Sequence, residues 1–129
     1  MANIGHFMIP ADNIDRAKRF YQSRLGWKIA KVAAPSMDLE MLAAMEYHDI
    51  STGNALAGTL NTGGLYKRHM NEPILNFVLV DDIDTVLANV ERLGGKITLP
   101  KTKIKGVGTN AMIQDSEGNV IGLLEPVRT

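Results

Sequence analysis

Apolar residues recur along this chain first as a continuous run and then at helical spacing, and this succession occurs twice. Residues 4–9 form a short apolar run that is typical of a strand. A helix with a periodic apolar face is predicted next, and that face consists of Ile14, Ala17, Phe20, Tyr21 and Leu25. Residues 75–80 repeat the strand, and the second predicted helix carries the apolar face Ile83, Val86, Leu87, Val90 and Leu93. The pattern therefore predicts a duplicated unit.

Polar and glycine residues mark the ends of both predicted helices. Residues 12–13 and residues 81–82 offer side-chain oxygens that accept hydrogen bonds from the free N–H groups of a first helical turn. Gly26 and the pair at 94–95 follow the helices, where glycine adopts the left-handed turn at little cost. Each helix is then followed by a Lys-Ile pair that begins another strand.

The middle of the first half is less regular. Residues 37–50 contain many good helix formers, so a helix is one interpretation. The duplication favours strands instead, particularly over residues 41–50. The segments that follow are expected to be a hairpin turn at 51–54, a small-residue strand at 55–60, a second turn at 61–64 and a polar linker at 65–72.

The end of the second half gives clearer signals. A strand is predicted over residues 96–99, where Pro100 ends it, and two further strands over 109–114 and 120–124. Residues 115–119 read Asp-Ser-Glu-Gly-Asn, which is a strong turn signal between the last two strands.

Each half thus has the order β-α-β-β-β, with module one at about 1–65 and module two at about 74–127 of a single domain, 1–129. Four strands and one helix cannot close a core alone. We therefore predict an α+β fold in which the two βαβββ modules form an eight-stranded curved sheet with the helices outside. The inner face of such a sheet is a cup, which suits a small-molecule ligand.

Composition narrows the possible partners. Lys+Arg and Asp+Glu both number 14 in 129 residues, which argues against a nucleic-acid binder and against steering to anionic membranes. The chain has no cysteine, so disulfides, thiolate catalysis and sulfur-ligated metal sites are excluded. No apolar run approaches the ~20 residues that span a bilayer, and no targeting signal is recognised. We expect a cytoplasmic protein, and the composition is compatible with a homodimer.

Three segments of the chain resemble the vicinal oxygen chelate superfamily: HFMIPADNIDRAKRFYQSRLGWKI, FVLVDDIDTVLANVERLGGKI, and the tail DSEGNVIGLLEP that follows Gly-Val-Gly at 106–108. This superfamily includes glyoxalase I, extradiol dioxygenases, methylmalonyl-CoA epimerase, and the bleomycin and fosfomycin resistance proteins. Within it, the sequence is most similar to proteins related to lactoylglutathione lyase. The resemblance implies the predicted fold and frequent dimerisation.

The resemblance also implies a test for a metal. Metal-dependent members place four ligands on the cup floor, two from each half: a histidine on the first strand, a glutamate on the last strand of the first half, a histidine or glutamine on the next strand and a glutamate on the final strand. Here these positions fall on His6, near Ala57, on Leu75 or Asn76, and on Gly122. Only His6 is a usual ligand, and a divalent ion needs three or four donors. We expect no metal cofactor, and a divalent metal is the alternative.

The third position depends on how the halves are aligned. The helices align at an offset of 69 residues, Ile14 with Ile83, whereas Phe7 and Phe77 align at 70. Glu125, three residues after Gly122, is expected on the opposite face of a regular strand.

Several residues are candidates for the site. Glu46 and His48 alternate on one predicted strand face and could join His6, so His6 and Glu46 are the candidate catalytic residues, as ligand or base. Candidate binding residues are Trp27, His48 and Asn76. Structural alternatives exist for each: Trp27 packing in a core, His48 facing solvent, and His6 as a core imidazole with a hydrogen-bond partner.

Three functions remain open. The first is a glyoxalase/bleomycin resistance-like protein that binds a small molecule in the cup without a metal. The second is a lactoylglutathione lyase-like isomerase or lyase with a rearranged metal site, so whether the chain is an enzyme stays undecided. The third is a structural or regulatory protein whose cup is filled by side chains.

Overall fold

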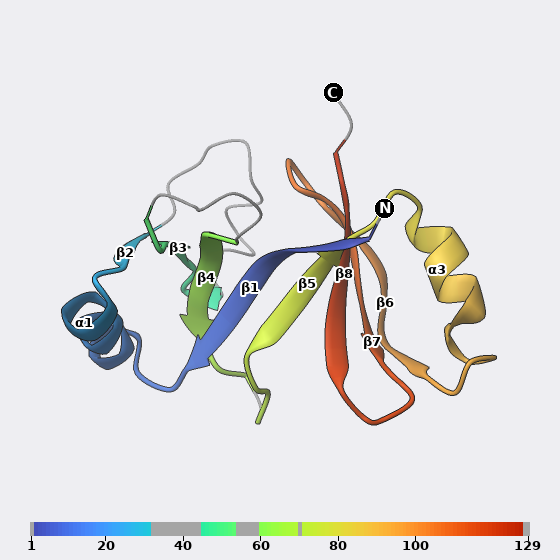
Figure 1. Ribbon diagram of the computed structural model, residues 1–129, viewed down its shortest axis with the longest axis horizontal. Helices are drawn as coiled ribbons and strands as arrows, with labels where there is room; N and C mark the ends of the chain where they lie inside the picture. Colours follow the sequence, from blue (N-terminus) through green and yellow to red (C-terminus); the bar gives the residue numbers. More distant parts are fainter. Residues whose placement is uncertain (1, 32–44, 54–59, 70, 128–129) are drawn as a thin grey trace. The chain divides into compact units, whose positions relative to one another are not determined.

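The computed structural model describes residues 2–31, 45–53, 60–69 and 71–127. The first module contains β1 (Asn3–Ala11), α1 (Ile14–Leu25), β2 (Lys28–Lys31), β3 (His48–Ser51) and β4 (Thr62–Lys67). The second module contains β5 (Leu75–Leu79), α3 (Ile83–Val90), β6 (Lys96–Ile104), β7 (Gly108–Gln114) and β8 (Val120–Pro126) (Figure 1). Among the described residues, the predicted strand and helix order β-α-β-β-β is confirmed in both halves.

By its contacts the chain divides into two units. The N-terminal unit spans His6–Ile74, and the C-terminal unit consists of Leu75–Thr129 with Met1–Gly5. Within the N-terminal unit the strand order is β2-β3-β4-β1, and within the C-terminal unit it is β6-β7-β8-β5. In each unit the first strand pairs in parallel with the last, and the other pairs are antiparallel. The α+β class and the eight strands of a mixed sheet are therefore confirmed.

Each unit has its own core between the helix and one strand face. In the N-terminal unit this core is Ile9, Ala11, Ile14, Ile29, Ile50 and Leu65. In the C-terminal unit it is Val80, Ile83, Ala111 and Leu123. The helices begin as expected, since the Asn13 side chain accepts from Arg16 N–H and that of Asp82 accepts from the N–H groups of Asp84 and Thr85.

The prediction for residues 61–72 is wrong at its start. Thr62–Lys67 is strand β4 rather than a turn and a linker, and Leu65 within it is 0% exposed. Strand β4 pairs with both β1 and β3, so the tertiary pairing overrides the local turn tendency of two glycines. Leu60 lies outside any strand, and the rest of the strand predicted at 55–60 lies outside the described residues.

The preferred strand over residues 41–50 is wrong at residues 45–47 and confirmed at residues 48–50. Met45 is helical, and Glu46 follows in a turn with a φ of 49°. The helix interpretation of this segment fits Met45, and the strand begins only at His48. Residues 41–44 lie outside the described part of the chain.

Pro100, which is predicted to end a strand, lies inside β6, and Pro10 likewise lies inside β1. Pro10 is opposite Tyr66 within the β1–β4 pair. Because the Ala11 carbonyl accepts from Arg68 N–H on the β4 side, backbone alternation turns the missing N–H of Pro10 away from β4. Pro100 lies in the edge strand β6. The register of β6 with β7 shifts on both sides of Leu99. An edge strand with an irregular register tolerates proline.

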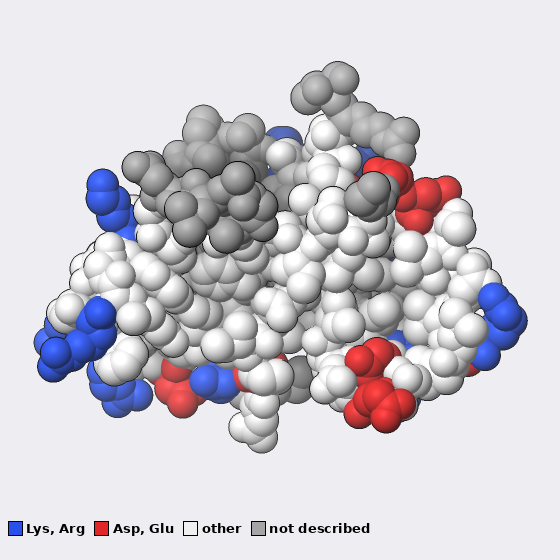
Figure 2. All heavy atoms as spheres, viewed as in Figure 1, with Lys and Arg blue, Asp and Glu red and all other residues white. Residues whose placement is uncertain are grey.

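The buried helix faces are narrower than predicted. Phe20 and Leu25 are 60% and 53% exposed, and Leu93 is 67% exposed. Helix α3 ends at Val90, so Leu93 lies beyond the helical stripe. The basic residues of α1 line its outer side, and Figure 2 shows Lys and Arg side chains gathered there. No helix among the described residues is long and apolar enough to cross a membrane.

Replacing Leu65 with alanine tests whether β4 carries the N-terminal core. Because Leu65 is fully buried, we expect Leu65→Ala to lower the free energy of unfolding by about 2–5 kcal/mol in urea titrations. The matched control Leu93→Ala removes the same atoms from an exposed site and should stay within about 0.5 kcal/mol of the parent. Equal costs for the two variants would contradict the placement of β4.

Candidate functional site

The face of the N-terminal unit opposite α1 carries His6. Phe7 packs against the core below α1, and successive strand residues point to opposite faces, so His6 and Met8 share the other face. Strand pairing adds residues that point the same way, because Gly64 lies opposite both Met8 and Asp49. We call this surface the His6 face, and its members are His6, Met8, Tyr47, Asp49, Gly64 and Tyr66.

A hydrogen bond joins His6 to Tyr47. The distance from His6 Nε2 to the Tyr47 hydroxyl oxygen is 2.9 Å. Tyr47 lies directly on Gly64, where an added Cβ would be 2.2 Å from the hydroxyl oxygen and 2.4 Å from Cζ. Any larger residue at position 64 would push the phenol away, so the glycine makes room for the His6–Tyr47 pair.

Burial keeps both members of the pair neutral. It lowers the pKa of His6 below its ordinary value of 6.5, and the nearby negative charge of Asp49 opposes this only in part. Burial, with a smaller effect of Asp49, raises the pKa of Tyr47. A single proton therefore occupies the contact: the phenol donates to Nε2, or a protonated Nε2 donates to the phenol oxygen.

The structure places Glu46 and His48 away from this pair. Glu46 is exposed in the turn before β3, so the prediction that it alternates with His48 on one strand face is wrong. His48 Nδ1 lies 2.9 Å from the backbone carbonyl oxygen of Glu46. His48 is opposite Leu65, on the α1 side of the sheet. Neither side chain belongs to the His6 face, and a catalytic role for Glu46 stays a prediction.

Trp27 and Asn76 also lie on other surfaces. The Trp27 ring stacks on Tyr21, with centroids 5.1 Å apart, and contacts Phe7 at 6.0 Å on the α1 side. This is the core-packing alternative. Asn76 is an exposed residue of the C-terminal unit between buried Leu75 and Phe77, so it points to the opposite face from these two.

Sequence reasoning missed Tyr47, Asp49 and Gly64. A tyrosine two residues before an aspartate is a weak alternation signal, and the glycine that accommodates it is distant in the chain. Only the register between β3 and β4 reveals that the three share one face.

Core packing settles how the two halves align. Ile9, Ala11 and Ile14 pack in one core as Val78, Val80 and Ile83 do in the other, which gives one offset of 69 for strand and helix alike. The alternative alignment of Phe7 with Phe77, at an offset of 70 residues, is therefore wrong.

This alignment identifies the equivalents of the metal positions. His6 corresponds to Leu75, and Met8 corresponds to Phe77. Met8 pairs with Gly64 in the parallel β1–β4 register, and Phe77 pairs with Gly122 in the parallel β5–β8 register. Gly64 is therefore the first-half equivalent of Gly122, the metal-ligand position on the final strand. The earlier placement near Ala57 falls outside the described residues and outside the last strand of the first module.

The residues at these positions do not fit a divalent ion. The N-terminal unit offers one imidazole and a glycine, and the C-terminal unit offers leucine and glycine. The space a side chain would need at Gly122 is filled by the Phe77 ring, 2.4 Å from an added Cβ. Among the described residues, no group of three or more histidine or carboxylate side chains is arranged to hold a metal.

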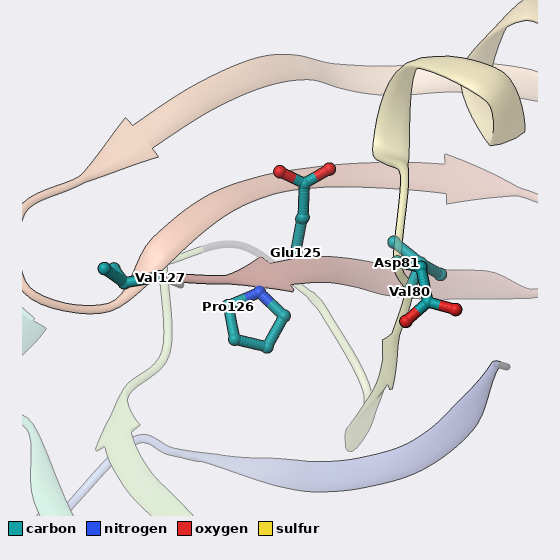
Figure 3. Close-up of a pocket in the computed structure, with 5 residues that line it drawn as sticks. All are labelled: Val80, Asp81, Glu125, Pro126 and Val127. Atoms are coloured by element: carbon teal, nitrogen blue, oxygen red, sulfur yellow. The ribbon is translucent and has the colours of Figure 1, made fainter. Parts of the chain in front are cut away.

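A separate pocket of about 370 Å³ lies in the C-terminal unit, lined by Val80, Asp81, Glu125, Pro126 and Val127 (Figure 3). The Glu125 carboxylate accepts a hydrogen bond from Ile83 N–H at 3.0 Å, so it supports the start of α3. Figure 3 shows the carboxylates of Asp81 and Glu125 pointing in opposite directions. The two do not form a joint metal or acid–base site.

Comparison with known proteins agrees with this fold. A sequence model of the Glyoxalase/Bleomycin resistance protein/Dioxygenase superfamily matches residues 3–123. The lactoylglutathione lyase of Haemophilus influenzae is 27% identical over 121 residues, covering 93% of this chain and 90% of that protein.

Two solved structures show the same fold at low identity. Methylmalonyl-CoA epimerase from Mycobacterium tuberculosis is similar with a TM-score of 0.63 and 16% identity, over 96% of this chain and 87% of that one. A superfamily member from Vibrio splendidus 12B01 has a TM-score of 0.63 and 14% identity, over 98% and 100% of the two chains.

We expect NMR titration of the His6 ring resonances to show that the pKa of the imidazole is lowered from its ordinary value of 6.5. In the range between the lowered folded pKa and 6.5, the unfolded chain binds more protons than the folded one, so the contribution of His6 to stability falls as the pH falls. In urea unfolding experiments, the free energy of unfolding of His6→Gln should lack this part of the pH dependence. Removing the opposing charge by Asp49→Asn should lower the pKa of His6 further, and a rise would contradict the site.

Gly64→Ala tests whether the Tyr47 ring packs directly on the backbone of Gly64. The new methyl group displaces the phenol, so we expect the His6–Tyr47 contact to break and the free energy of unfolding to fall by about 1–3 kcal/mol. The same substitution in a Tyr47→Ala background has no phenol to displace and should cost less. A coupling near zero in this double-mutant cycle would show that the two residues are not in contact.

Proposed function

The chain belongs to the Glyoxalase/Bleomycin resistance protein/Dioxygenase superfamily, and from this premise we propose that it binds a small molecule on the His6 face without using a metal ion. The observation that carries the proposal is the hydrogen bond between His6 and Tyr47. The pair occupies a face where the resemblance implies metal ligands, and where the second ligand position of this unit is a glycine.

The chemistry of the His6 face suits recognition of an uncharged polar group. Met8 is 9% exposed and lies opposite Gly64, on which the Tyr47 ring packs, so the polar pair has an apolar neighbour. Ligand sites combine such apolar surfaces with a few fixed polar groups that set orientation. A neutral imidazole and a neutral phenol exchange hydrogen bonds with a hydroxyl or carbonyl without the cost of desolvating a charge.

A second candidate is isomerase or lyase activity, which the similarity to the H. influenzae lactoylglutathione lyase supports. A neutral His6 can accept a proton, as a general base must near neutral pH. A rearranged metal site built on Glu46 and His48 is less well supported, because His48 Nδ1 is engaged with the Glu46 carbonyl.

Binding is tested by a thermal-shift screen of a broad small-molecule library with the full chain. A ligand present at 100 times its dissociation constant should add about 2.7 kcal/mol of stability. We expect hits to lose affinity in His6→Ala and to keep it in the matched control His69→Ala, because His69 is an exposed residue after β4. Hits that are equally sensitive to both substitutions, or no hits at all, would contradict the proposal.

Metal analysis and two assays separate the candidates. After incubation with nickel, zinc, manganese, iron or cobalt, we expect dialysed protein to retain a substoichiometric amount of metal, because the His6 face offers a single imidazole. We also expect lactoylglutathione and methylmalonyl-CoA to remain unchanged when incubated with the protein. Stoichiometric metal together with turnover would establish the lyase or isomerase instead.

A further inference from the structure

We propose that Tyr47 is the residue through which the His6 face contacts its ligand, and that Asp49 beside it selects uncharged or cationic ligands over anionic ones. The inference deepens the proposed function and rests on it, since it requires that a small molecule binds this face. It names a contact residue and a charge class that the family resemblance does not supply.

The first part follows from how the pair is held. The bond to Tyr47 uses His6 Nε2, whereas the phenol oxygen has further hydrogen-bonding capacity. When the phenol donates to Nε2, its oxygen accepts from a ligand hydroxyl. When Nε2 donates, the phenol donates to a ligand carbonyl. Gly64 fixes the ring in place from below, so the hydroxyl is preorganised and little side-chain entropy is lost on binding.

The second part follows from the charges on the His6 face. Asp49 is exposed, lies opposite Gly64, and acts electrostatically on both His6 and Tyr47. A second carboxylate, Glu72, accepts a hydrogen bond from the Tyr66 hydroxyl at 3.1 Å. An anionic ligand placed against the Tyr47 hydroxyl would therefore meet the negative charge of Asp49.

The basic groups nearby do not cancel this charge. Arg68 pairs with Asp12 at 3.0 Å and also donates to the carbonyls of Glu72 and Pro10. Lys28 is exposed opposite Ser51, two residue pairs along β2 and β3 from Asp49 and therefore on the same face, and no ion pair joins Lys28 to Asp49 among the described residues. The arginines and lysines of α1 lie on the helix side of the unit. Asp49 thus remains a negative charge that acts on both members of the His6–Tyr47 pair.

The test uses sets of probes that share an aromatic ring and include a neutral, a cationic and an anionic member. One set is benzyl alcohol, benzylamine and benzoate, and another is catechol, dopamine and 3,4-dihydroxybenzoate. Dissociation constants are measured with the full chain by NMR shifts of the His6 and Tyr47 resonances. We expect each carboxylate to bind about tenfold more weakly than its neutral or cationic partner, as for one charge a few ångströms away near a protein surface.

Two variants assign the effect to residues. Tyr47→Phe keeps the ring and removes the hydroxyl, and it should weaken every probe of a set by about fivefold or more. Asp49→Asn should leave the alcohols nearly unchanged and bring the carboxylates level with the amines. The matched controls are Tyr21→Phe and Asp15→Asn, which remove a hydroxyl and a charge from the α1 side and should change nothing.

The outcomes distinguish this inference from the proposed function. Probes or library hits that perturb His6 but ignore both Tyr47→Phe and Asp49→Asn would overturn the inference and leave the binding function standing. Preferred binding of carboxylates would overturn the charge selection in the same way. A protein whose His6 and Tyr47 resonances respond to no probe and to no library compound would overturn both.

Discussion

Two adjacent glycines in β4 determine how both faces of the N-terminal unit are built. Gly63 faces the α1 side, where an added Cβ would be 2.5 Å from the Phe7 ring, and Gly64 faces the other side beneath Tyr47. Each aromatic ring lies where a side chain of β4 would otherwise project. On one face the result is the Phe7–Trp27–Tyr21 cluster that supports α1. On the other it is a phenol placed within hydrogen-bond distance of His6.

A glycine covered by an aromatic ring also occurs in the C-terminal unit, and comparing the two cases indicates how the two halves have diverged. Gly122 lies beneath Phe77 as Gly64 lies beneath Tyr47, and the two glycines are equivalent in strand register. The resemblance implies carboxylates at these positions in metal-dependent relatives. In this chain an aromatic ring covers each of them. One half retains an imidazole with a phenol partner, whereas the other half has only apolar side chains there.

The His6–Tyr47 pair is a polar feature that burial makes uncharged. Desolvation lowers the pKa of the imidazole and raises that of the phenol, and the exposed carboxylate of Asp49 modifies both. A partly buried pair of this kind satisfies its own hydrogen bond and needs no ion to neutralise it. On this feature we base the proposal that a small polar molecule, rather than a metal ion, binds the His6 face.

The sequence alone determined the duplication, the βαβββ order and the helix starts, because these depend on local periodicity and capping side chains. Its motifs also identified the family by resemblance. His6 was identified because the resemblance places a ligand histidine on the first strand. Tertiary structure alone decided that residues 62–67 form a strand, that Glu46 lies in a turn, and that Tyr47 rather than Glu46 partners His6. Those outcomes depend on which strands pair and in what register, and a one-residue change in register moves every side chain to the other face. Such long-range pairing leaves no periodic signal in the residues themselves.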